Sequence, residues 1–346
     1  MPLRIAILSP VWFPVPPTGY GGTERVVSLL ADSLVEAGHD VTLFASGDSH
    51  SKAKLVSVFD VAPSAQIGHS IPEIHHALAC LERAGEFDII NDHSGPPAAV
   101  MCGLVGTPAV HTLHGPLDGP IAPKVYRQIA NVAPRVGLIS ISLNQRKPEP
   151  GLPWIANCPN AIDISVYPCQ DKKSDYLVFV GRMNPDKGAH HAIQIANETG
   201  LPLKLAGKMQ DLEEKEYFNA RIKPHLSERI EYMGEVTHDE KVALLQNARL
   251  TLFPIEWEEP FGLVPIESMA CGTPVLATRY GAVPEVIASG IGGIVVDHVS
   301  DMVAMIDTAA ALDPLDCRRY VEESFRPERM VADYVAAYER AISGEW

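Results

Sequence analysis

Short apolar runs alternate with longer segments of helical periodicity along almost the whole chain. Residues 5–8 form the first apolar run, a Gly/Pro-rich loop follows at residues 10–22, and residues 23–37 have a helical pattern that Gly38 ends. A second apolar run follows at residues 41–45. This order of strand, loop, helix and strand predicts a βαβ unit, from which parallel sheets are built.

The same alternation continues through both halves of the chain. Apolar runs predict the remaining strands, at residues 87–90, 109–112 and 138–142 in the first half and at residues 176–180, 203–205, 230–232, 250–253, 275–278 and 294–296 in the second. A polar stretch, residues 169–175, separates the halves. We therefore predict the α/β class, with two Rossmann-like parallel-sheet domains at residues 1–169 and 170–326. A C-terminal segment, residues 327–346, contains a last helix that this pattern assigns to neither domain.

Composition and charge narrow the class of protein. The 346 residues suffice for about two domains, and 46% hydrophobic with 21% charged residues exclude a disordered or fibrous chain. The net charge of -15 disfavours nucleic acid and anionic membranes as partners. No apolar stretch approaches the roughly 20 residues of a transmembrane helix. The first apolar run is too short for a signal peptide, so we expect a cytoplasmic protein.

The cysteines and acidic motifs argue against a metal site. None of the six cysteines stands in a Cys-x-x-Cys pair or at a zinc-ligand spacing from histidine, so we expect reduced, structural thiols. The chain also has no Asp-x-Asp motif that would hold a divalent cation on a diphosphate. The sequence predicts no metal ligands and no requirement for a metal.

Ligands of parallel α/β sheets bind at the carboxyl ends of the strands, so the loops there are the candidate site. After the first strand, Gly21 and Gly22 precede a helix, where close backbone approach and unpaired N–H groups suit an anion. A turn that merely needs glycine explains the loop equally well, and Thr23 fits a simple helix cap. After the first strand of the second half, Arg182 and Lys187 suit a diphosphate, although two solvated cations are the alternative.

The most informative stretch is the acidic loop and helix at residues 256–272. The helix starts near residues 262–265, and Gly272 ends it. Glu259 and Glu267 stand eight positions apart, one in the loop and one in the helix. Carboxylates bind hydroxyls while the N–H groups between them face an anion, a combination that fits a sugar nucleotide. Either glutamate alone would be an ordinary solvated or first-turn acid.

Histidines follow two strands of the first half. His114 follows the strand at residues 109–112 and is a candidate ligand contact, with a hydrogen-bonded structural histidine as the alternative. His111 and the Asp92–His93 pair are weaker candidates. Thr237 and Glu240 match a capping box, whose role is primarily structural.

With these residues in place, the chain resembles the retaining glycosyltransferases of family 4, which have the GT-B fold of two Rossmann-like domains facing a cleft. The matching segments run in order through the chain: residues 21–25, 110–115, 159–163, 181–188, the Glu259-x7-Glu267 motif with residues 270–275, and residues 281–285. Ala161 departs from the family, where glycine is common. Glu256, Glu258 and Glu259 stand close together in the sequence. Only the spacing of eight residues to Glu267 therefore identifies Glu259 as the first glutamate of the motif.

The resemblance implies a role for each motif. The first domain would face the acceptor and the second would bind the nucleotide sugar, while the last helix would cross back onto the first domain. Arg182 and Lys187 would neutralise the donor diphosphate, Glu267 would bind the ribose, Glu259 the donor sugar, and His114 would lie near the reactive face of that sugar. The remaining donor contacts would come from the backbone of the two loops: Gly21, Gly22, Phe261, Gly262, Leu263 and Val264.

These roles imply a retaining hexosyltransferase that uses a UDP- or GDP-linked sugar and an acceptor hydroxyl, without a metal or other cofactor. The alternatives are a GT-B sugar-nucleotide epimerase or hydrolase, and a binding protein without turnover. A nicotinamide dehydrogenase fits poorly because the Gly-x-Gly-x-x-Gly fingerprint is missing. Donor base, donor sugar, acceptor and oligomeric state stay open.

Overall fold

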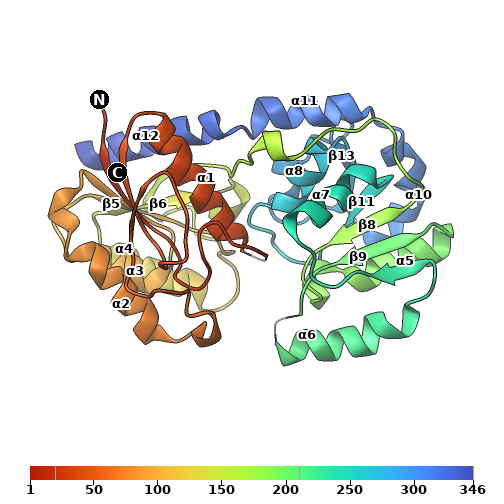
Figure 1. Cartoon of the computed structure of the whole chain (residues 1–346), viewed down its shortest axis with the longest axis horizontal. Coiled ribbons are helices and arrows are strands. Elements are labelled where there is room, and N and C mark those ends of the chain that lie inside the picture. Colours follow the sequence, from red (N-terminus) through yellow and green to blue (C-terminus); the bar gives the residue numbers. More distant parts are fainter. Residues whose placement is uncertain (20, 210, 346) are drawn as a thin grey trace. The chain divides into compact units, whose positions relative to one another are not determined.

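A computed structural model describes residues 1–19, 21–209 and 211–345 (Figure 1). The chain divides into two compact units, Met1–Ala161 with Pro327–Trp346, and Ile162–Arg326. Three positions in the predicted segments lie outside the described residues: Tyr20 in the glycine loop, Gln210 in the second predicted domain, and Trp346 at the end of the C-terminal segment.

Within the described residues, the first unit has a sheet of seven parallel strands in the order β3-β2-β1-β4-β5-β6-β7. The strands are β1 (Arg4–Leu8), β2 (Asp40–Phe44), β3 (Lys54–Val56), β4 (Ile89–Asp92), β5 (Ala109–Thr112), β6 (Val136–Ser140) and β7 (Trp154–Asn157). Chain order reverses between β1 and β4, which makes the carboxyl ends of these strands the switch point where ligands of such sheets bind.

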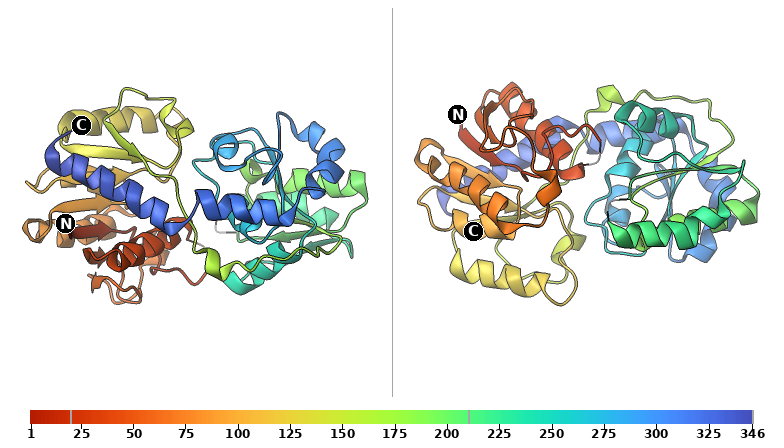
Figure 2. Two further views of the ribbon diagram at one scale, coloured as in Figure 1. Left: turned by 90° about the horizontal axis from the view of Figure 1, so that it is seen from above. Right: turned by 60° about the horizontal axis from the view of Figure 1, so that its bottom comes forward.

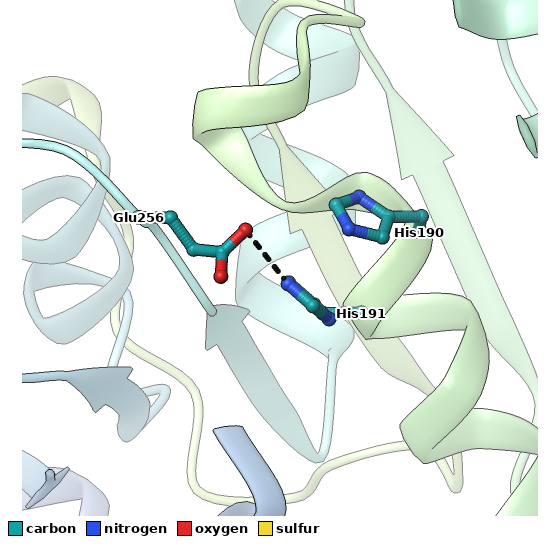
Figure 3. Close-up of side chains that lie close together, drawn as sticks. All are labelled: His190, His191 and Glu256. Atoms are coloured by element: carbon teal, nitrogen blue, oxygen red, sulfur yellow. Dashed lines mark ion pairs between the residues drawn. The ribbon is translucent and has the colours of Figure 1, made fainter. Parts of the chain in front are cut away.

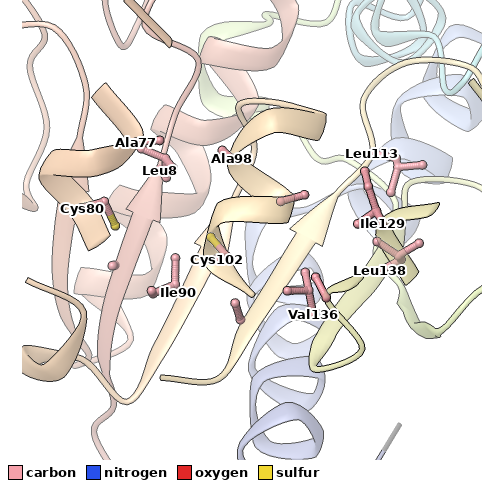
Figure 4. Packing of buried hydrophobic residues seen from close by; sticks show 14 of the residues in the cluster. Leu8, Ala77, Cys80, Ile90, Ala98, Cys102, Leu113, Ile129, Val136 and Leu138 are labelled. Atoms are coloured by element: carbon pink, nitrogen blue, oxygen red, sulfur yellow. The ribbon is translucent and has the colours of Figure 1, made fainter. Parts of the chain in front are cut away.

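Helices cover this sheet and close its core. They are α1 (Gly22–Glu36), α2 (Ser70–Leu81), α3 (Pro96–Cys102), α4 (Ala122–Val132) and α12 (Pro327–Ser343), with short 3-10 turns at Ser64–Gln66, Ala84–Glu86 and Asn144–Arg146. Leu8 and Ile90 from the strands pack against Cys80 of α2 and Cys102 of α3 (Figure 4). Burial raises the pKa of Cys80 to about 12, so this thiol is a neutral core group. All six cysteines are free thiols.

Helix α12 belongs to the first unit, although 165 residues of the second unit precede it in the chain. It lies beside the first unit's sheet and α1 (Figure 2). Tyr338 is fully buried there, and its hydroxyl accepts a 2.7 Å hydrogen bond from Asn91 of β4. The Arg340 guanidinium also donates to the carbonyl of Ile155 in β7.

The second unit has six parallel strands within its described residues, in the order β10-β9-β8-β11-β12-β13. The strands are β8 (Leu177–Val180), β9 (Leu203–Ala206), β10 (Ile230–Tyr232), β11 (Leu250–Phe253), β12 (Val275–Thr278) and β13 (Gly293–Val296). The helices are α5 (Ala189–Thr199), α6 (Leu212–Tyr217), α7 (His238–Asn247), α8 (Leu263–Ala270), α9 (Val283–Val286), α10 (Val299–Ala310) and α11 (Pro314–Ser324). A π-helical turn, Phe218–Ile222, extends α6, and 3-10 turns occur at Ile164–Val166, Pro185–Lys187 and Lys223–His225. The switch point lies between β8 and β11.

The α/β class and both parallel sheets are confirmed. The capping box is also present, since Thr237 accepts from the backbone of Glu240 and Glu240 accepts from the backbone of Thr237. The interpretation of Thr23 as a helix cap is wrong: Gly21 is the N-cap of α1, and Thr23 lies inside the helix. The second unit begins at Ile162 rather than at residue 170, because Tyr167 is buried in it and donates to Glu267.

Candidate functional site

The loop after β8 carries both predicted phosphate-binding cations. Arg182 follows the strand by two positions, and Lys187 ends a 3-10 turn just before α5. Gly188 is the N-cap of α5 with φ 77°, and a Cβ there would lie 2.0 Å from the carbonyl oxygen of Pro254. Only glycine therefore allows this loop to pack against the chain leaving β11.

Each of these cations has a carboxylate partner. The Arg182 guanidinium donates to Glu214 at 2.9 Å, and Lys187 Nζ lies 2.6 Å from Glu259 Oε2. The Lys187 ammonium also lies 4.2 Å from the ring centroid of Trp257, whose Nε1 donates to the same Glu259 oxygen at 3.1 Å. The predicted donor-sugar and diphosphate residues, Glu259 and Lys187, thus form one cluster with Trp257. A phosphate that reaches Lys187 would compete with Glu259 for it.

The backbone of Glu259 is held by the loop after β12. Ala282 N–H donates to the carbonyl of Glu259 at 2.8 Å. The neighbouring Gly281 has φ 57°, and a Cβ on it would lie 2.3 Å from the backbone of Glu259. The sequence segment at residues 281–285 therefore positions the acidic loop.

Helix α8 begins and ends where the sequence predicts. Gly262 is its N-cap, and Gly272 follows the C-cap residue with φ 73°. Leu263 and Val264 form the first turn and are partly exposed, so their backbone amides stand at the positive end of the helix dipole. The side chain of Phe261 instead packs edge-on against Phe325, which leaves only its backbone for a ligand.

Glu267 lies inside α8 and is 2% exposed. Its Oε1 accepts from Lys241 Nζ at 2.5 Å and from the hydroxyl of Tyr167 at 2.9 Å. These two donors hold the carboxylate in a fixed orientation. Neither Lys241 nor Tyr167 was singled out in the sequence, because both stand far from Glu267 along the chain.

In the first unit, His114 forms a pair with His93. Its Nε2 lies 2.8 Å from His93 Nδ1, and the rings stack. Burial, with a smaller contribution from His111, lowers the pKa of His114 to about 3, so the ring is neutral near pH 7. His111 lies 2.5 Å from Asp92, and its other nitrogen is 3.1 Å from the hydroxyl of Tyr126. Of the weaker sequence candidates, His93 thus contacts His114 directly, and His111 contacts Asp92.

The glycine loop precedes α1 at the carboxyl end of β1. Gly21 has φ 149°, and a Cβ there would lie 2.8 Å from Pro17. Gly22 begins the helix. The conformation of the loop requires glycine at position 21, which supports the turn interpretation and leaves the phosphate contact as a hypothesis.

One cluster within the described residues has the composition of a metal site. It comprises His190, His191 and Glu256 (Figure 3). The sequence did not predict it, since adjacent histidines in a helix match no ligand spacing and Glu256 lies 65 positions after His191.

Family models match both units and identify the class of protein as a glycosyltransferase of the GT-B fold. The family model described as Glycosyltransferase Family 4 matches residues 20–148, and the model described as Glycosyl transferases group 1 matches residues 168–322. The chain belongs to the family 4 type of glycosyltransferases.

Similar proteins agree with this assignment. A glycogen synthase of Mycobacterium tuberculosis is 26% identical over 84% of this chain and 82% of its own. AviGT4, a glycosyltransferase involved in avilamycin A biosynthesis, is 27% identical with a TM-score of 0.74 over 99% of both chains. HepE of Anabaena, solved with UDP and glucose, is 19% identical with a TM-score of 0.75 over 97% of this chain and 99% of its own. In the described part of the chain, every helix is too short or too polar to span a membrane.

Proposed function

We propose that this glycosyltransferase moves a hexosyl group from a UDP- or GDP-linked sugar to an acceptor hydroxyl, with retention of the anomeric configuration. The observation that carries the proposal is the cluster in which Lys187, from the loop after β8, meets Trp257 and Glu259 of the acidic loop that precedes α8. A cation, a carboxylate and the amides of a helix N-terminus are groups that suit a sugar diphosphate.

The donor diphosphate would replace Glu259 as the partner of Lys187. A diphosphate carries more charge than a carboxylate, so the ammonium gains by the exchange, and Glu259 becomes available to the hydroxyls of the donor sugar. Arg182 would likewise turn from Glu214 toward the phosphate. These two cations would neutralise the leaving group, which is the task that a metal performs in other enzymes, so no metal requirement is expected for transfer.

The remaining roles follow the same geometry. Glu267, held by Lys241 and Tyr167, would accept from the ribose hydroxyls. Neutral His114 would donate a hydrogen bond near the reactive face of the sugar, and it would do so without adding positive charge. The amides of residues 262–264 and the backbone of Gly21 and Gly22 would contact the phosphates. No side chain is assigned as a nucleophile; the departing phosphate would deprotonate the acceptor on the same face.

The alternative functions differ in whether they require an acceptor and whether they release a nucleoside diphosphate. An epimerase or hydrolase of the same fold forms product without an added acceptor, whereas a transferase requires one. A binding protein without turnover would bind the donor and release no nucleoside diphosphate.

The donor is identified by a thermal-shift panel of nucleoside diphosphates and their sugars. A ligand at about 100 times its Kd stabilises the folded state by about 2.7 kcal/mol, which is easily detected. We expect the largest shift with a UDP- or GDP-sugar. The similarity to HepE supports the fold alone. The nucleotide base of the donor must therefore be identified by this measurement. A flat panel across all nucleotides would contradict the proposed donor class.

The first prediction concerns Lys187→Ala, which should lower turnover by about two orders of magnitude, the loss of about 2.7 kcal/mol of transition-state stabilisation. Steady-state transfer with the identified donor measures it. Lys172→Ala, at an exposed position of the same unit, is the matched control and should retain the wild-type rate. A wild-type rate for Lys187→Ala would remove the diphosphate assignment.

A further inference from the structure

The His190, His191 and Glu256 side chains converge from two elements (Figure 3). The histidines occupy the first turn of α5, and the glutamate lies in the loop between β11 and α8. One possible ligand atom from each residue lies within 4.8 Å of the other two. Two imidazoles and a carboxylate form a donor set that suits zinc and related late first-row cations, whereas Mg²⁺ and Ca²⁺ prefer oxygen ligands alone.

His191 is the least satisfied member of the cluster. Its Nε2 forms a 3.0 Å ion pair with Glu256 Oε2 that lacks hydrogen-bond geometry, and its Nδ1 makes no hydrogen bond within the described part of the chain; both nitrogens are shielded from water. A buried polar atom without a partner costs about 1–3 kcal/mol. Two ligand atoms that approach each other without hydrogen-bond geometry are what a common third partner, a cation, would produce.

His190 is held in an orientation that suits a ligand. Its Nδ1 lies 2.7 Å from the hydroxyl of Tyr217, which also accepts from the backbone N–H of His190 at 3.2 Å. When Nδ1–H donates to Tyr217, the lone pair of Nε2 is available for a metal. Such an outer hydrogen bond, which fixes ring and tautomer, accompanies most metal-binding histidines.

The backbone on both sides of the cluster is already fixed. The Glu256 N–H donates to the carbonyl of Asp186 at 2.9 Å, and Gly188 packs against Pro254. Ligand bonds to zinc of about 2.0–2.1 Å place neighbouring ligand atoms roughly 3.3 Å apart in a tetrahedron. The Glu256 side chain is 47% exposed, so it can turn to close the remaining distance without disturbing the core.

We propose that His190, His191 and Glu256 bind a late first-row divalent cation of the zinc class, with water completing the coordination. The site is separate from the cations that would hold the donor diphosphate, and it does not depend on the proposed function. An ion bound here connects the first turn of α5 to the loop that carries Trp257 and Glu259. It therefore restricts the movement of that loop.

The test is a titration of the metal-free full chain with Co²⁺, followed by visible absorption, and then displacement by Zn²⁺. We expect one equivalent of Co²⁺ to give d–d bands of a low-coordinate site, and Zn²⁺ to abolish them. His191→Ala and Glu256→Gln should each weaken binding at least about tenfold. His298→Ala, at an exposed histidine of the same unit, should bind like the wild type. Mg²⁺ should produce no change.

Thermal unfolding gives a second readout, which separates a loss of metal binding from a loss of the fold. Zn²⁺ should raise the unfolding temperature of the wild type and of His298→Ala, and it should not raise that of Glu256→Gln, whose exposed side chain is not needed for folding. The site is refuted if submillimolar Co²⁺ gives no bands with the wild type, or if Glu256→Gln and His191→Ala bind the ion as tightly as the wild type does.

Discussion

The His93–His114 pair shows how a buried contact determines the hydrogen-bonding face of a candidate catalytic group. Both rings are neutral near pH 7, because burial lowers the pKa of each. One proton therefore lies between His93 Nδ1 and His114 Nε2. His93 Nε2 is buried and has no hydrogen-bond partner in the described part of the chain. Since an orphaned N–H is rarer than an orphaned acceptor, the proton is assigned to His93 Nδ1.

This assignment makes His93 a positioning residue: it donates to His114 Nε2 and leaves Nδ1–H of His114 as the remaining donor. His93→Ala should lower kcat about fivefold to tenfold with little change in the KM for donor, as expected for one hydrogen bond of about 1 kcal/mol. His93→Asn, whose amide nitrogen can replace Nδ1–H, should recover most of the rate. Equal kcat for wild type and His93→Ala would reduce the pair to a structural contact.

The sequence predicts the residues of the candidate site better than their partners. Lys187 and Glu259 were identified from local motifs, and the structure joins them. Trp257 was missed, although it stands two positions before Glu259. Glu214 and Lys241 were missed because their contacts with Arg182 and Glu267 depend on the folded chain: each pair is separated by more than 20 positions.

At the scale of elements, helix α5 offers a matched comparison of two glycines. Gly188 at its start and Gly200 at its end have φ 77° and φ 73°. A Cβ at Gly200 meets nothing within 4 Å, whereas one at Gly188 would lie 2.0 Å from the Pro254 carbonyl. A comparison of substitutions at these two positions therefore separates the free-energy cost of backbone strain from that of a steric clash.

Gly200→Ala should therefore cost about 1–2 kcal/mol of stability, the strain of a left-handed alanine. Gly188→Ala should cost about 3 kcal/mol or more, because the β11 loop must also move. Urea unfolding of both variants measures the difference. Similar losses for the two variants would mean that the contact with Pro254 contributes nothing.

Helix α2 carries a second kind of buried histidine. His76 is 2% exposed, and its Nε2 lies 3.1 Å from the carbonyl of Ser9 just after β1. Burial lowers the pKa of His76 from 6.5 to about 4. Between these values the unfolded chain binds more protons than the folded chain, so stability decreases as the pH falls from about 6.5 toward about 4.

His76→Gln keeps a donor for Ser9 and removes the titration. Its stability should depend less on pH than that of the wild type, by up to about 1.4 kcal/mol per pH unit within this window. Urea unfolding from about pH 7 to about pH 5 provides the measurement. His225→Gln, at an exposed histidine, should retain the wild-type slope. A slope for His76→Gln equal to that of the wild type would contradict the assignment.

The hydrophobic periodicity predicted the buried strands but missed two strands that are exposed or only partly buried. The runs at residues 109–112, 230–232, 250–253 and 275–278 coincide with β5, β10, β11 and β12. Strands β3 and β7 were not predicted: Lys54 and Leu55 are exposed at the sheet edge, and the apolar run in Trp154–Asn157 is only three residues long and mostly just partly buried. Helices α2, α3 and α4 lie in segments where no motif marked a boundary.

At the scale of the whole molecule, the first unit is assembled from both ends of the chain. Residues 1–161 supply its sheet, and residues 327–346 supply α12. Sequence order alone could not make this assignment, since the apolar face of α12 suits either sheet. The side chains settle it: Tyr334 and Tyr338 are fully buried, and Tyr338 bonds to Asn91 in the middle of the first sheet.

Tyr338→Phe tests whether helix α12 stabilises the first unit, on whose sheet it packs. The change leaves the buried amide of Asn91 without its 2.7 Å partner, which should cost about 1–3 kcal/mol. Hydrogen exchange should then become faster in β4 and β5 and stay unchanged in β8 and β9, because the opening is confined to the first unit. Tyr320→Phe, whose hydroxyl bonds to Val286 in the second unit, should leave exchange in β4 and β5 unchanged. Uniformly faster exchange across both sheets in Tyr338→Phe would mean that the two units unfold as one, and that α12 stabilises the whole chain.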